Sequence, residues 1–89
     1  MVAALIIDAS IETKIKERHN LTHTEVREAV MLDPQVQAEW QEDERNGRRL
    51  AVWGTTYTNR PVIAYLVPVN WNDPDEGTYR LKTALSRPG

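Results

Sequence analysis

The sequence predicts a single α+β domain in which two helices precede an antiparallel sheet. Apolar residues recur at helical spacing in the first third of the chain, whereas the remainder shows the short alternating or continuous apolar runs that are typical of strands. Asn46-Gly47, a strong hairpin signal, lies inside the strand-like part. Because helices come first and strands follow, we expect segregated layers, with both helices covering one face of a four-stranded antiparallel sheet.

A short strand and a first helix are expected at the start of the chain. Residues 5–7 form a continuous apolar run, which predicts a short buried strand. Asp8 or Ser10 can cap a helix that runs to about His19. Asn20 directly after it suits the left-handed conformation that ends many helices.

A second helix is predicted from its capping residues. Thr22 and Glu25 have the spacing of a capping box, in which the hydroxyl and the carboxylate bond each other's backbone N–H groups. Val26, Ala29 and Val30 supply the apolar stripe that follows. Asp33-Pro34 should end this helix, because the residue before a proline avoids helical angles.

The rest of the chain predicts the sheet, with strands over residues 36–41, 50–56, 62–67 and 78–85. Thr58-Asn59 should make a turn, and residues 70–77 a loop. The run over 62–67 is apolar at every position, which favours a central strand. In the last strand, alternation should place Tyr79, Leu81, Thr83 and Leu85 on one face and Arg80, Lys82 and Ala84 on the other.

Length and composition bound the possible functions. Eighty-nine residues, 40% of them hydrophobic, suit one domain over residues 1–89 with one modest core. The chain has no cysteine, which excludes disulfides, thiolate metal sites and cysteine nucleophiles. Its apolar start is too short to span a membrane and lacks the flanks of a signal peptide, so we expect a soluble, cytoplasmic protein.

Charge and metal-ligand patterns narrow the possibilities further. The formal net charge is −2, whereas nucleic-acid-binding domains are usually basic. Bases cluster at residues 14–19, 45–49 and 80–87, so a basic face can still form on an acidic protein. The acidic loop over 73–76 does not continue to the Glu that closes a calcium-binding loop, and we expect no metal and no cofactor.

The polar residues of the helical half have a distinctive order. His19 follows Asp8 by eleven positions within Arg18-His19-Asn20, and Thr22, Glu25 and Asp33-Pro34 come after it. This order resembles the BrnT-type toxins, small ribonucleases of the RelE-like class, which carry Lys-His-Gly at the same distance from an Asp that ends the first strand.

The strand half extends the likeness over nearly the whole chain. Segments 49–55 and 60–67 resemble the family's strand ending in Gly-x-Thr and its central strand, and segment 79–84 resembles its Arg-Ile-Ile-Ser-Ala segment. The family usually continues with Ser-Ala-Arg, whereas this chain has Leu85.

The resemblance implies a RelE-like fold and a toxin of a type II toxin-antitoxin system. Such a toxin would be a metal-independent endoribonuclease that cleaves RNA and blocks translation. Its partner would be a cognate antitoxin, commonly a ribbon-helix-helix DNA binder, in a homo- or hetero-oligomer. No membrane partner is expected.

Metal-free RNA cleavage needs proton transfer and positive charge beside the phosphate. His19, in a helix's last turn where the dipole favours the imidazolium, is the first candidate for proton transfer, and Lys16 or Glu17 could serve as the base. Arg80 and Lys82, two apart on one strand, are expected to hold the phosphate and complete the catalytic set. The residues expected to extend the RNA-binding surface are Arg49, Arg60, Lys16 and Arg18.

Each of these residues also has a simpler interpretation. His19 can bond the last carbonyls of its helix, and Arg80 and Lys82 can form a solvated outer strand face. The tryptophans can form core and partner contacts or stack on bases. Leu85 and the acidic net charge favour a non-catalytic RelE-like protein-binding module, and a DNA-binding regulator is disfavoured because no basic recognition helix is evident.

Overall fold

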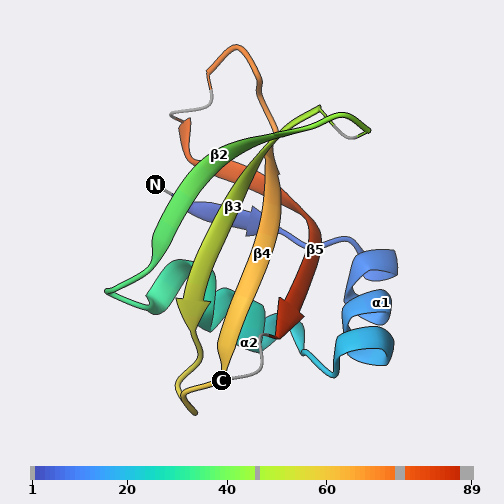
Figure 1. The fold of residues 1–89 in the computed structure, drawn as a ribbon, viewed down its shortest axis with the longest axis vertical. Coiled ribbons are helices and arrows are strands. Elements are labelled where there is room, and N and C mark those ends of the chain that lie inside the picture. Colours follow the sequence, from blue (N-terminus) through green and yellow to red (C-terminus); the bar gives the residue numbers. More distant parts are fainter. Residues whose placement is uncertain (1, 46, 74–75, 87–89) are drawn as a thin grey trace.

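One sheet organises the chain, and Figure 1 shows its five strands with the helices at one side and behind it. The computed structural model describes residues 2–45, 47–73 and 76–86, and its strand order is β1-β5-β4-β3-β2. The strands are β1 (Ala4–Ile6), β2 (Gln37–Asp43), β3 (Gly47–Thr55), β4 (Pro61–Pro68) and β5 (Thr78–Ser86). β1 runs parallel to β5, and the other three pairs are antiparallel.

The α+β class is confirmed, but the prediction of four antiparallel strands is wrong. The expected N-terminal strand joins the sheet as a fifth member, parallel to the strand that comes last in sequence. A three-residue apolar run carries no information on its partner or direction, because pairing depends on contacts with residues far along the chain. The central position of β4, predicted from its unbroken apolar run, is confirmed.

Helix α1 (Ala9–His19) begins and ends where the sequence predicts. Asp8 is its N-cap residue in an extended conformation, although its side chain makes no capping hydrogen bond. Asn20 takes the left-handed conformation, with φ 52°. The backbone N–H of Leu21 donates to the Ile15 carbonyl at 3.1 Å, which is the hydrogen bond of a Schellman motif, with Asn20 in the position that glycine usually occupies.

The second predicted helix is present in two parts. Helix α2 (His23–Arg27) starts with the predicted capping box: Thr22 Oγ1 accepts from the Glu25 N–H, and Glu25 Oε1 accepts from the Thr22 N–H, both at 3.1 Å. It continues without a break into η1 (Glu28–Leu32), a π-helical segment. Asp33 is extended and ends the helix, as the following proline predicts. None of the helices among the described residues is long and apolar enough to cross a membrane.

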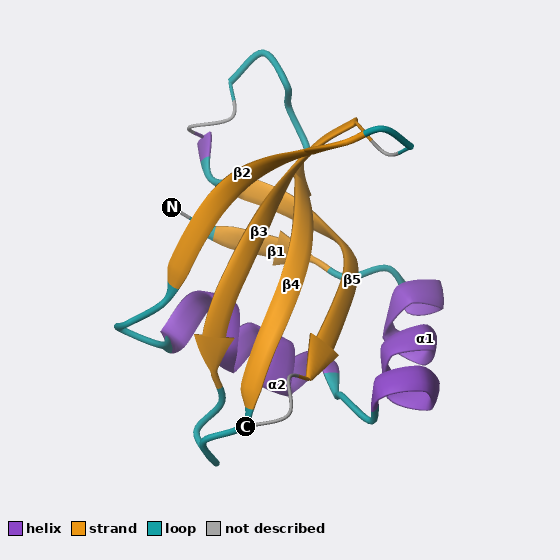
Figure 2. Cartoon of the chain, in the orientation of Figure 1, coloured by secondary structure: helices purple, strands orange, loops and turns teal. Residues whose placement is uncertain are grey.

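The core lies between the sheet and this second helical segment. Val26, Ala29 and Val30 are buried, and they belong to one apolar cluster with the inward-facing residues of β3, β4 and β5. Ile15 of α1 completes the cluster beside β5. Figure 2 shows α2 behind the strands, so the face toward the viewer is not covered by any helix of the described chain. We call this the open face; its side chains come from the alternate positions of each strand.

A β-bulge changes the predicted alternation of β5. Tyr65 pairs with Thr83 and the next residue, Leu66, pairs with Leu81, so Lys82 is an extra residue in the ladder. Tyr79 and Leu81 face the core as predicted, but Ala84 is buried. The prediction that Thr83 and Leu85 share the face of Leu81 is therefore wrong, because the extra residue moves both of them to the open face.

The predicted turns are present where the structure describes them. Asn59 has φ 64° in the turn between β3 and β4, and the Asn59 N–H donates to the Thr56 carbonyl at 3.0 Å. Gly47 opens β3 with φ 71°, whereas Asn46 lies outside the described residues.

The helical layer approaches β3 closely at Gly54. A Cβ atom at this position would overlap the backbone carbonyl oxygen of Ala29 in η1. The absence of a side chain at Gly54 therefore sets the distance between η1 and the sheet.

We predict that Gly54→Ala lowers the free energy of unfolding by about 3 kcal/mol, since the methyl group must push η1 away from the sheet. Gly47→Ala is the matched control: its Cβ would meet open space, and only the left-handed backbone opposes it, at about 1 kcal/mol. Urea unfolding followed by circular dichroism measures both. Equal stability of Gly54→Ala and the unsubstituted chain would contradict this packing.

Candidate functional site

Arg60, predicted to bind RNA, lies at the joint between the two helices. Its Nη1 donates to the Asn20 carbonyl at 2.6 Å and its Nη2 to the His19 carbonyl at 3.0 Å. Its Nε donates to Ser86 Oγ at 2.9 Å, and Nη1 also contacts Glu25 Oε2 at 3.2 Å. One guanidinium thus connects the end of α1, the start of α2 and the end of β5. These bonds satisfy carbonyls that every helix C-terminus leaves without intrahelical partners.

The turn before β4 holds Arg60 in place. Thr56 is buried, and its hydroxyl accepts from the Arg60 N–H at 3.0 Å. The Thr56 N–H donates to the Arg60 carbonyl at the same distance. Because both backbone groups of Arg60 are bonded to one buried threonine, its side chain leaves the sheet in a fixed direction, toward the helix joint.

Glu25 is the acidic partner of this joint. Burial by itself would raise the pKa of the Glu25 carboxyl, but hydrogen bonds from the Thr22 backbone and from the Arg60 guanidinium outweigh it and lower the pKa below its usual 4.5. The carboxylate is therefore charged at neutral pH and serves the capping box and the ion pair together.

Arg80 occupies the opposite end of α1. Its Nη1 donates to both oxygens of Asp8, at 2.9 and 3.0 Å, and the two side chains are 44% and 46% exposed. His19 is the last residue of the same helix, eleven residues later. At about 1.5 Å per residue these ends lie about 16 Å apart. The sheet gives a similar distance. Ser86, which bonds Arg60, and Arg80 pair with β4 residues that are five positions apart, which corresponds to about 17 Å.

The structure therefore does not bring the predicted proton-transfer group to the predicted phosphate clamp. Cleavage would require both groups to lie within hydrogen-bond reach of the reacting oxygens of one phosphodiester. The roles of His19, Arg80 and Lys82 remain predictions. The sequence places His19 and Arg80 correctly on their elements; which ends of those elements meet depends on the parallel pairing of β1.

Arg49 and Lys82, by contrast, come together on the open face. They line one hollow of about 180 Å³ with Val67 and Thr83. The guanidinium carbon of Arg49 lies 3.9 Å from the ring centroid of Tyr65, an attractive cation–π contact that fixes its direction. Lys82 is exposed because it is the extra residue of the bulge. Two cations and an aromatic ring thus share one surface of three neighbouring strands.

Lys16 and Arg18, the remaining predicted RNA contacts, are exposed on α1. Lys16 borders a separate hollow with Glu12 and His23, whose side chains approach to 3.9 Å. Neither residue lines the hollow between Arg49 and Lys82.

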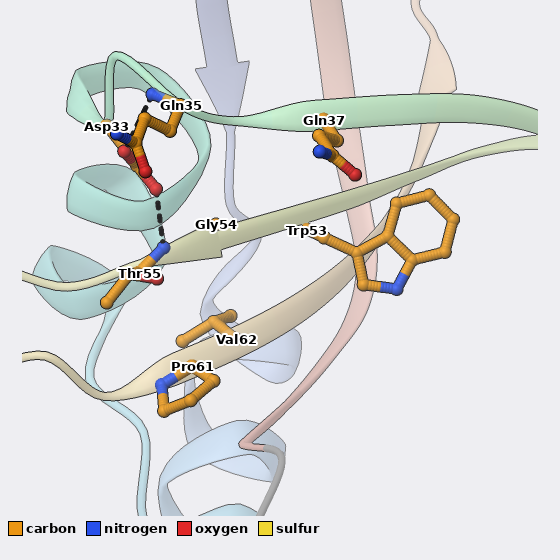
Figure 3. Close-up of a pocket in the computed structure, with 8 residues that line it drawn as sticks. All are labelled: Asp33, Gln35, Gln37, Trp53, Gly54, Thr55, Pro61 and Val62. Atoms are coloured by element: carbon orange, nitrogen blue, oxygen red, sulfur yellow. Dashed lines mark hydrogen bonds between the residues drawn. The ribbon is translucent and has the colours of Figure 1, made fainter. Parts of the chain in front are cut away.

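A second hollow of the sheet, about 230 Å³, was not anticipated from the sequence (Figure 3). Trp53 of β3 and Gln37 of β2 lie next to each other on it, and Asp33 and Gln35 border it from the connection between η1 and β2. Asp33 Oδ1 accepts from the Gln35 N–H and Oδ2 from the Thr55 N–H, both at 2.9 Å. The available signal was the alternation of β2 and β3, which places Trp53 and Gln37 on one face once their register is known.

The tryptophans differ in exposure, which bears on whether they form core contacts or could stack on bases. Trp40 packs against the core, with its ring centroid 6.5 Å from that of Tyr79. Trp53 is half-buried on the open face, and Trp71 is 51% exposed in the loop after β4.

No protein-family model matches the chain, and no curated protein matches its sequence. Among the described residues no group of three or more His, Asp or Glu side chains is arranged to hold a metal ion.

We predict that Arg60→Met, which keeps most of the side-chain volume, lowers the free energy of unfolding at pH 7 by about 3 kcal/mol. The substitution removes the charged partner of Glu25 and the side-chain donor of two helix-end carbonyls. Lys14→Met on the exposed surface of α1 is the control and should have little effect. Chemical denaturation at neutral pH compares the two variants, and equal stabilities would contradict the role given to Arg60.

The lowered pKa of Glu25 predicts a pH dependence of stability. A carboxyl group whose pKa is lower in the folded state stabilises the fold above its unfolded-state pKa, and this contribution is lost as pH falls through the folded-state pKa. Stability of the unsubstituted chain should therefore decrease as pH falls below about 4.5, and Glu25→Gln should show a smaller decrease over that range. Unfolding free energies measured from pH 7 to pH 3 make the comparison, and parallel curves would show that Glu25 is not responsible.

Proposed function

We propose that this chain is a RelE-like toxin that acts on RNA as a metal-independent endoribonuclease, and that its RNA surface is the open face around Arg49 and Lys82. The observation that carries the proposal is the meeting of these two cations beside Tyr65 in one hollow. Lys82 is exposed, and Arg49 is half-buried with its guanidinium over Tyr65. A planar guanidinium and an ammonium beside an aromatic ring suit a phosphate with an adjoining base.

The same hollow limits the chemistry available there. Its lining residues are Arg49, Val67, Lys82 and Thr83, which include no carboxylate and no imidazole. Arg49 would stabilise the charge that develops on the phosphate when the ribose 2′-hydroxyl attacks it. Lys82 or water would take the proton of the 2′-hydroxyl and return one to the leaving 5′-oxygen, because His19 does not line this hollow.

The proposal includes a partner and a place of action. A toxin that blocks translation acts in the cytoplasm and needs a cognate antitoxin, for which a ribbon-helix-helix protein is the expected type. The antitoxin would neutralise the toxin by covering the open face, and acidic side chains would complement Arg49 and Lys82.

The alternative is a non-catalytic RelE-like protein-binding module, and one observation favours it. Arg80 is paired with Asp8, and His19 is separated from it by the length of α1. A surface that binds without cleaving needs no convergence of these groups.

We predict that the purified chain binds single-stranded RNA and cleaves it in the presence of a metal chelator. Arg49→Ala and Lys82→Ala should each reduce the cleavage rate at least tenfold, since each removes a cation from the phosphate. Each should also lower the slope of log affinity against log salt concentration by about 0.7, the value expected for one lost contact to single-stranded RNA. Filter binding across a salt series and gel analysis of labelled RNA provide the two measurements.

Lys14→Ala is the matched control, because it removes an exposed lysine of α1 outside the open face. Expression in bacteria should arrest growth with the unsubstituted chain and with Lys14→Ala, and not with Lys82→Ala. RNA that is bound but left intact would favour the binding module. A chain that neither binds RNA nor slows growth would exclude the toxin.

A further inference from the structure

Trp53 and Gln37, which border the second hollow, lie on the same face of the sheet as Arg49 of the proposed phosphate site. Arg49, Ala51 and Trp53 alternate along β3, so their side chains share the open face. Arg49 and Trp53 are four residues apart, about 13 Å at the rise of a strand. RNA-binding domains that use a sheet surface stack two or three bases on aromatic side chains of one face.

The surface between these two positions is low and aromatic. Ala51, fully buried by its neighbours, has only a methyl group; Tyr65 pairs with it on the β4 side, and the exposed carboxylate of Glu39 lies on the β2 side, away from this path. A chain that leaves Arg49 can therefore pass over Tyr65 to Trp53 without meeting a large side chain from β3.

Trp53 and Gln37 both carry hydrogen-bonding side-chain groups, an indole N–H and an amide. Within the described part of the chain, no residue bonds the indole N–H of Trp53 or the side-chain amide of Gln37, and Figure 3 shows both side chains on the same side of their strands. Gln37 and Trp53 pair across β2 and β3, which places an amide beside an indole plane. A nucleobase uses this combination, since the ring stacks on an aromatic face and its edge bonds an amide.

The charge of the hollow favours a base over a phosphate. Its lining contains no Lys, Arg or His, and its one acid, Asp33, has each carboxylate oxygen bonded to a backbone N–H. An anionic phosphate would gain nothing there, whereas a neutral heterocycle would not be repelled.

We infer that Trp53 and Gln37 form a nucleobase-binding subsite for the single-stranded RNA whose phosphates contact Arg49 and Lys82. Trp53 stacks on the base, and the Gln37 amide bonds its edge, with adenine the preferred base because a glutamine amide can bond adenine's ring nitrogen and amino group together. This inference rests on the proposed function, and it adds a position at which the bound RNA is read.

The test measures the affinity of the full chain for short labelled oligoadenylate and oligouridylate at several salt concentrations. Trp53→Ala should weaken oligoadenylate binding about tenfold, the usual effect of losing one stacking contact, and leave the salt slope unchanged. Trp53→Phe, which keeps a ring, should retain most of the affinity. Gln37→Ala should reduce the preference for adenine over uracil about fivefold.

Two controls separate stacking from folding and from charge. Trp71→Ala removes another exposed indole, in the loop after β4, and should bind as the unsubstituted chain does. Inorganic polyphosphate has charge but no bases. Lys14→Ala, Trp53→Ala and the unsubstituted chain should therefore bind it with equal affinity. Thermal unfolding of each variant confirms that it is folded.

The failures of the two proposals differ. Normal oligoadenylate binding by Trp53→Ala, with a normal salt slope, would overturn the base subsite and leave phosphate binding by Arg49 and Lys82 intact. The same result with a weakened antitoxin complex would assign the hollow to a protein partner. Weakened polyphosphate binding by Trp53→Ala would also overturn the subsite, and no RNA binding by the unsubstituted chain would overturn both proposals.

Discussion

The fold depends on a single guanidinium that joins parts of the chain far apart in sequence. Arg60 bonds the last carbonyls of α1, the carboxylate that caps α2 and the hydroxyl at the end of β5. Two helix ends that meet inside a small domain leave carbonyl and N–H groups without intrahelical partners. Here Arg60 bonds two of the carbonyls, and the capping box bonds two of the N–H groups. An arginine predicted to contact RNA is thus used to hold the scaffold together.

Features set by neighbouring residues were predictable from the sequence. Asn20 ends α1, Thr22 and Glu25 cap α2, and Asp33 stops the helical segment, because each of these depends on contacts within a few residues. The unbroken apolar run of β4 likewise predicted a central strand, and β4 does have a strand on each side, although no helix of the described chain covers its open face.

Features that depend on distant residues were not predictable. The parallel direction of β1 is decided by β5, more than seventy residues later, and the partners of Arg60 come from three separate elements. The bulge at Lys82 is visible only in the pairing with β4, and it changes which side chains of β5 face the core. The same holds for the candidate site. Arg49 and Lys82 are recognisable as basic residues in the sequence, but the hollow that they share, the contact of Arg49 with Tyr65 and the pairing of Trp53 with Gln37 follow from strand register.

The parallel pairing of β1 with β5 has a consequence for how the nascent chain matures. On the ribosome the first strand emerges early, yet its only described ladder partner, and the arginine that binds Asp8, are made after every other strand of the sheet. Closing such a long loop is slow, because the entropy of the intervening chain is lost before the contact forms. Until then β5 has no neighbour on that side, and α1 is not anchored at its first turn.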